Sequence, residues 1–129
     1  MGMDIYGRKP SAPEGRYFRA TIGEWNPIYQ LIAKLCSDLL DQRTFEEMAV
    51  NQGAGPRSQK MCMKMADRFE AWMRENPKSS FRVTRGLPMV KMLAKGGFTF
   101  LSGSPYRVER SLLQEWAKFL RHCGGFEVW

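Results

Sequence analysis

Apolar residues at helical spacing between positions 28 and 40 most constrain how this chain can fold. They recur at intervals of three and four residues, which is the spacing of one face of an α-helix. The stripe consists of Ile28, Leu31, Ile32, Leu35, Cys36, Leu39 and Leu40. Asn26 and Pro27 precede it, and these residue types are preferred at the N-cap and at the first helical position. The sequence therefore predicts a core-facing helix from Asn26 to about Gln42, and Thr44 to Met48 can add one more turn.

Two further helices are expected from the same periodicity. One begins at about Arg57 or Ser58 and runs to Glu75, where Asn76-Pro77 ends it. The other covers about Val108 to Cys123. Gly124-Gly125 follows it and supplies the left-handed residue that commonly ends a helix.

The segment between these two helices is less regular. Residues 79–84 and 98–101 alternate between apolar and polar or are rich in aromatic and β-branched types, which favours two strands. Residues 87–95 favour a short helix that begins near Pro88. Ser102-Gly103-Ser104-Pro105 has the composition of a turn.

The two ends of the chain each predict a short strand. These strands are residues 3–6 and 126–129, and their pairing would tie the termini together. A chain of 129 residues has the length of a single domain. We therefore expect one domain, residues 1–129, of class α+β and mainly helical. It would contain about three helices and a small antiparallel sheet that joins the termini.

The positive charge of the chain is concentrated in its middle. Lys and Arg number 20 against 13 Asp and Glu, which gives a formal charge of +7. The segment from Arg57 to Arg107 holds 11 basic and 3 acidic residues, whereas the remainder holds 9 and 10. Such asymmetry indicates an acidic protein, a nucleoprotein complex, or DNA or RNA directly as the partner. The alternative is a solvated face that only keeps the protein soluble.

Several of these cations are candidates for a binding face because three- and four-residue spacing places them along one edge of the second helix. The candidate basic face comprises Arg57, Lys60, Lys64 and Arg68 on that helix and Arg82, Arg85, Lys91 and Lys95 downstream. Contacts of such residues with phosphates would make affinity fall with salt. Trp72, Phe81 and Phe98 could stack on unpaired bases, although spacing favours Trp72 as a core residue.

Methionines offer a second kind of contact. Met61 and Met63 fall off the main apolar face of the second helix. Flexible, polarizable Met side chains suit an adaptable binding patch, but a wide helix also buries flanking Met residues. With Phe81, these two residues are the candidate anchors.

Catalytic and metal chemistry find little support in the sequence. Cys36, Cys62 and Cys123 lack the CxxC spacing of metal sites, and His122 is the only histidine. A helix N-terminus after the Gly53–Lys60 loop can hold a phosphate, but the loop lacks the GxxxxGK[ST] pattern of a P-loop. We therefore expect no cofactor, no metal and no catalytic residues.

Two terminal blocks carry a resemblance. MGMDIYG at residues 1–7 and FLR followed by GGFE at residues 119–127, together with residues 17–19 and 51–55, resemble a family of small proteins of bacteria and their phages. The likeness covers about half of the chain, and the family has no established activity. It implies a mobile-element setting, where small proteins often bind host or phage machinery. Some similar sequences carry Cys-rich knuckles, but this chain has only Cys62 in that region, so no metal is implied.

The start of the chain lacks the basic and apolar regions of a signal peptide, and no apolar run approaches a membrane span. A cytoplasmic protein without membrane contact is expected. The function that we expect is a non-catalytic basic binding protein of phage or mobile-element type. It would inhibit or modulate a host nucleoprotein or defence complex. The alternatives are a direct nucleic-acid-binding accessory protein and a small enzyme that acts on nucleotides or nucleic acid through residues 53–60.

Overall fold

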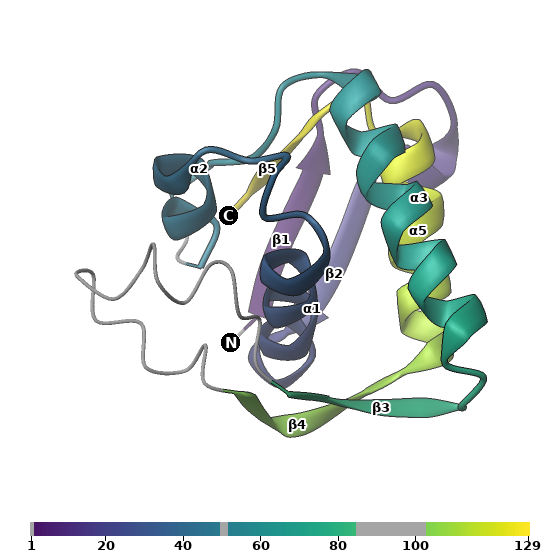
Figure 1. Cartoon of the computed structure of the whole chain (residues 1–129). Helices are drawn as coiled ribbons and strands as arrows, with labels where there is room; N and C mark the ends of the chain where they lie inside the picture. Colours follow the sequence, from purple (N-terminus) through teal and green to yellow (C-terminus); the bar gives the residue numbers. More distant parts are fainter. Residues whose placement is uncertain (1, 50–51, 85–102) are drawn as a thin grey trace.

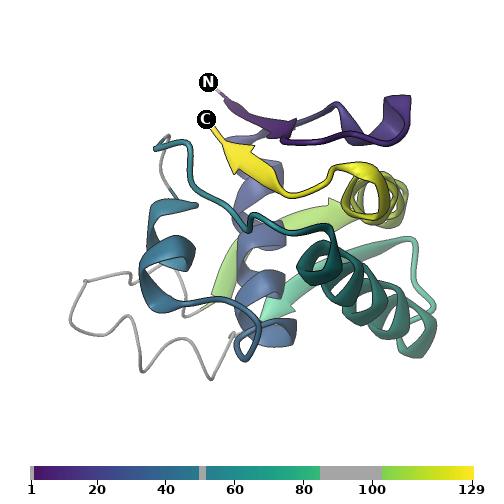
Figure 2. The same ribbon diagram turned by 90° about the horizontal axis from the view of Figure 1, so that it is seen from above.

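The computed structural model describes residues 2–49, 52–84 and 103–129. Its helices lie on one side of a three-stranded sheet that both ends of the chain build (Figures 1 and 2). The class is α+β and mainly helical, as the sequence predicts. Within the described ranges, no helix is both long enough and apolar enough to cross a membrane.

The terminal sheet has the strand order β2-β1-β5, with both pairs antiparallel. Strand β1 covers Gly2–Gly7, β2 covers Tyr17–Thr21 and β5 covers Phe126–Val128. Ile5 on the central strand lies opposite Phe18 and Val128, and all three side chains are buried toward the helices. This register confirms the prediction that a small sheet joins the termini.

Helix α1 covers Ile22–Leu35, so the expected start at Asn26 is wrong. The hydroxyl of Thr21 accepts a hydrogen bond from the Glu24 N–H (3.1 Å), and the Glu24 carboxylate accepts one from the Thr21 N–H (2.8 Å). This reciprocal capping box satisfies two free donors at the helix start. Pro27 lies inside the helix, where the earlier start also buries Trp25.

The end of α1 also differs from expectation, because the helix stops at Leu35 instead of continuing to about Gln42. Helix α2 follows as a separate element, Gln42–Glu47. Asp41 starts it, since its carboxylate accepts a hydrogen bond from the Thr44 N–H at 3.0 Å. Phe45 on α2 stacks on Tyr29 of α1 with ring centroids 4.3 Å apart. Helix α2 thus closes one end of the core.

Helices α3 (Gln59–Glu75) and α5 (Arg110–His122) confirm the two other expected helices and pack against each other. Ser58 caps α3 by accepting a hydrogen bond from the Met61 N–H. Gly124 and Gly125 follow α5 with φ of 67° and 88°, which glycine adopts readily.

A two-stranded ribbon precedes α5. It pairs β3 (Ser80–Thr84), the expected strand, with β4 (Gly103–Glu109). The predicted turn at residues 102–105 is therefore wrong for Gly103 to Pro105, because pairing with β3 keeps the backbone extended up to Glu109. The same pairing places Val108 on the strand, so α5 begins at Arg110. The helix expected at 87–95 and the strand expected at 98–101 lie outside the described residues.

The buried apolar side chains form one contiguous cluster beneath the terminal sheet. Trp116 on α5 is fully buried at its centre. Its indole contacts rings from β2, α1, α3, α5 and β5, namely Phe18, Trp25, Phe69, Phe119 and Phe126. This shared centre fixes α3 relative to the sheet, and thereby positions the surfaces described next.

Candidate functional site

Three exposed cations of the candidate face lie in a row along the sequence at the start of α3: Lys60 and Lys64 are on the helix, whereas Arg57, expected on it, precedes the N-cap Ser58. We call this row the basic edge. None of the three makes an ion pair with another described residue. Lys60 and Lys64 are four residues apart and therefore project from the same side of the helix. The basic edge can contact successive negative groups of a partner without first breaking an internal salt bridge.

Arg68, the fourth cation predicted on this helix, has a structural role instead. Its guanidinium donates to both carboxylate oxygens of Asp38 (2.8 and 2.9 Å) and to the carbonyl of Leu35 (2.7 Å). The hydrogen bonds with Arg68 lower the pKa of Asp38 to about 2. Arg68 therefore ties α3 to the carboxyl end of α1 and is not a free cation.

Two of the three acidic residues of α3 form ion pairs with α5. Arg121 makes ion pairs with Asp67 and Glu70. The amide of Gln59 donates to the carbonyls of Leu120 and Arg121 and accepts from the Gly124 N–H. These contacts fix α5 against α3, and the single charge of Arg121 offsets part of the negative charge of Asp67 and Glu70.

The structure describes only part of the remaining predicted set. Arg82 is exposed on β3, while Arg85, Lys91, Lys95 and Phe98 lie outside the described residues. Phe81 is only 4% exposed, and its ring packs on Trp72 with centroids 4.7 Å apart.

Phe81 therefore packs in the core, where it cannot anchor a partner. Met61 is partly buried against the core, and Met63 is 37% exposed beside Arg121. Of the three candidate anchors, Met63 is the accessible one.

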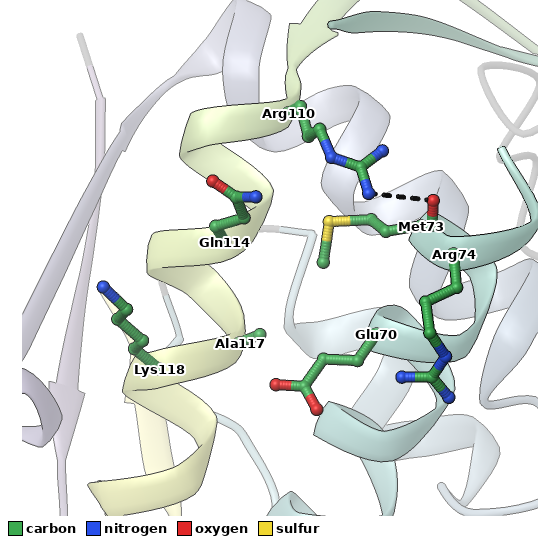
Figure 3. A pocket seen from close by; sticks show the side chains of 7 residues that line it. All are labelled: Glu70, Met73, Arg74, Arg110, Gln114, Ala117 and Lys118. Carbon is green, nitrogen blue, oxygen red and sulfur yellow. Dashed lines mark hydrogen bonds between the residues drawn. The ribbon is translucent and has the colours of Figure 1, made fainter. Parts of the chain in front are cut away.

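A groove of about 490 Å³ lies between α3 and α5 (Figure 3). Arg110 lines it but donates to the carbonyls of Met73 and Asn76, both at 3.0 Å, and so caps the end of α3. Arg74 and Lys118 are exposed at the groove, whereas the carboxylate of Glu70 is paired with Arg121. Arg74 and Lys118 make no ion pair with a described residue, and the Lys118 side chain points away from α3 (Figure 3).

The three cysteine thiols are buried in the core, and the histidine contacts a neighbouring hydroxyl. Cys36, Cys62 and Cys123 are fully buried, and burial raises the pKa of Cys36 to about 12. The Nδ1 atom of His122 is within hydrogen-bond distance of the Ser11 hydroxyl. Among the described residues, no group of three or more His, Cys, Asp or Glu side chains could hold a metal ion.

The backbone of the Gly53–Lys60 loop is hydrogen-bonded to strand β5 of the terminal sheet. The Gly53 N–H donates to the Val128 carbonyl. The Val128 N–H donates to the Ala54 carbonyl, and the Phe126 N–H donates to the Pro56 carbonyl. The loop thus acts as an extension of the sheet edge beside β5, which leaves its backbone poorly placed to enclose a phosphate.

Two exposed aromatic residues were not predicted as candidate binding residues. Tyr6 and Tyr17 lie opposite each other on β1 and β2, and their ring centroids are 5.2 Å apart. The alternation of apolar residues could have indicated their exposure, because Tyr6 follows the buried Ile5 and Tyr17 precedes the buried Phe18 on their strands. What the sequence did not contain was the register that makes them neighbours.

Comparisons with protein-family models, with curated proteins and with solved structures found no match to this chain.

Proposed function

We propose that this protein is a non-catalytic binding protein that docks, through its basic edge, on the nucleic acid of a host nucleoprotein complex. It would act in the cytoplasm of a bacterial host, in a phage or mobile-element setting, as an inhibitor or modulator of that complex. The setting follows from the resemblance of the terminal blocks. The docking role follows from the surface.

The observation that carries the proposal is the exposed, unpaired state of Arg57, Lys60 and Lys64. Arg121 makes ion pairs with Asp67 and Glu70 of α3, and Arg68 makes one with Asp38. The three cations of the basic edge are exposed and make no salt bridge with a described residue. Such a surface speeds encounter with a polyanion and releases counterions when it binds.

A binding role has more support than a catalytic one. The thiols are buried, and burial raises the pKa of Cys36, so this thiol stays protonated and unreactive near neutral pH. The loop that a nucleotide-acting enzyme would use, residues 53–60, is hydrogen-bonded to β5. Direct binding to free nucleic acid is the second candidate, and the same basic edge favours it.

The test is fluorescence anisotropy with labelled single-stranded and duplex DNA and RNA at several salt concentrations. The variant Arg57→Glu/Lys60→Glu/Lys64→Glu should bind at least about 10-fold more weakly at low salt, because three phosphate contacts are lost. Its salt slope on single strands should fall by about 2, at about 0.7 per contact.

The matched control is Lys34→Glu/Lys78→Glu/Arg82→Glu, which makes the same change in net charge at exposed sites outside the basic edge. It should keep most of the affinity and the slope. Equal losses in both variants would show that only the overall charge matters, and would overturn the proposal. Circular dichroism checks that α3 remains folded in both.

A further inference from the structure

The outer face of the β2-β1-β5 sheet carries the tyrosine pair. Tyr6 and Tyr17 are 45% and 44% exposed, and no described helix covers this face (Figure 2). Their rings are inclined by 39° to each other. Adjacent aromatic rings on an open surface are a platform on which other flat rings, such as unpaired bases, can stack.

Polar contacts hold this platform in place. The Tyr17 hydroxyl donates to a carboxylate oxygen of Asp4, and Arg19 pairs with the same oxygen at 3.4 Å. The hydrogen bond to Asp4 also raises the pKa of Tyr17, so the phenol stays neutral. Arg19 remains 61% exposed beside the rings. A surface ordered before binding loses less entropy when it binds.

The glycine turn before β5 lies between the end of β1 and Arg57, the first residue of the basic edge. Strand β1 ends, β5 begins and α3 starts at the same corner of the molecule, at the top of Figure 1. A Cβ atom on Gly125 would lie 2.7 Å from the backbone of Arg57, and one on Gly124 would lie 2.2 Å from the carbonyl oxygen of Lys9. Lys9 and Arg57 therefore flank the glycine turn.

Further cations border the tyrosines at this corner. The carbonyl of Arg16 accepts from the Gly7 N–H, which places Arg16 beside Tyr17 and across from the end of β1. Lys9 and Arg16 are exposed and make no ion pair with a described residue. Arg8 differs, because it binds the carbonyls of Phe126 and Gly55 and pairs with Glu127. Exposed cations thus lie between the basic edge and the aromatic pair, where the carboxylates of Asp4, Glu14 and Glu115 are also close to Tyr17.

We propose that Tyr6 and Tyr17 form a stacking site for unpaired bases, so that the nucleic acid bound by this protein is single-stranded. The backbone of the strand would follow Lys64, Lys60 and Arg57 to Lys9 and Arg16, and its bases would stack on the two rings. A groove of positive charge that leads to exposed aromatic rings is the usual combination for sequence-tolerant binding of single strands. This inference rests on the proposed function, because it specifies the form of the nucleic acid that the basic edge meets.

The test compares a fluorescein-labelled oligothymidylate of about 16 nucleotides with a duplex of the same length. The variant Tyr6→Thr/Tyr17→Thr removes both rings but keeps residues that favour strands. It should bind the single strand at least about 10-fold more weakly, since each stacked base contributes measurably to affinity. Duplex affinity and the salt slope should stay unchanged, because the cations remain.

Two controls separate stacking from general loss of surface. Tyr6→Phe/Tyr17→Phe keeps the rings and should retain wild-type binding to the single strand. Ile22→Thr removes an exposed apolar side chain on α1 and should have no effect. In a bromodeoxyuridine oligonucleotide, photo-crosslinks should map to Tyr6 or Tyr17 by mass spectrometry.

The outcomes also separate this inference from the proposed function. If the threonine variant binds the single strand as the wild type does while the basic-edge variant fails, the stacking site is overturned and the docking role stands. If the basic-edge variant binds normally, the docking role fails. A wild-type dimer in sedimentation that the threonine variant cannot form, without any change in oligonucleotide affinity, would assign the face to a second copy and overturn the stacking site.

Discussion

At the scale of single residues, the contact between Arg68 and Asp38 shows what a sequence pattern leaves out. Spacing along α3 correctly placed Arg68 near Lys64. Its partner, however, lies 30 residues away, after the end of α1. Nothing local marks Asp38 as that partner. The exposed tyrosines illustrate the same limit, because alternation predicts which way each side chain points but not which strand lies beside it.

The Asp38 contact predicts a pH dependence of stability. The folded-state pKa of Asp38 is lowered from 3.8 to about 2, so its contribution is fully present above about pH 4 and is lost as pH falls through 2. Asp38→Asn should therefore lower the free energy of unfolding at pH 6, and the difference from wild type should shrink toward pH 2. Urea titrations at several pH values measure it. A difference that is constant with pH would contradict a charge-based contact.

At the scale of elements, the start of α1 shows two local signals in competition. Asn26-Pro27 has the composition of a helix start, yet Thr21 and Glu24 form the capping box. The outcome depends on burial, because the extra turn places Trp25 in the core, where its Nε1 donates to the Met48 carbonyl at 3.1 Å. Helices α3 and α5 were predictable because their long apolar faces had no such competitor.

The capping box gives a prediction about α1. Thr21→Ala removes the acceptor for the Glu24 N–H and should lower the free energy of unfolding by about 1 kcal/mol. Thr21→Ser keeps the hydroxyl and should restore most of that loss. Thermal or urea unfolding followed by circular dichroism measures both. Equal stability of the alanine variant and the wild type would show that α1 does not depend on this cap.

At the scale of the whole molecule, the pairing of β1 with β5 was predictable because both ends are short apolar segments with glycines beside them, whereas β2 was not predicted. The arrangement of the helices under the sheet was not, since it depends on how large side chains fill one shared core. Trp116 decides much of that arrangement. Its indole contacts rings from two strands of the terminal sheet and from two other helices.

This position predicts a large and cooperative effect of Trp116. Trp116→Ala should lower the free energy of unfolding by about 3–5 kcal/mol, because a fully buried ring is replaced by a cavity. Trp116→Phe should cost much less, since it keeps most ring contacts and removes an Nε1 donor that has no hydrogen-bond partner among the described residues. Urea unfolding should show one transition by circular dichroism and by the fluorescence of the other tryptophans. Separate transitions would mean that the sheet and the α3–α5 pair unfold independently, and the basic edge and the tyrosine pair would then not share one rigid frame.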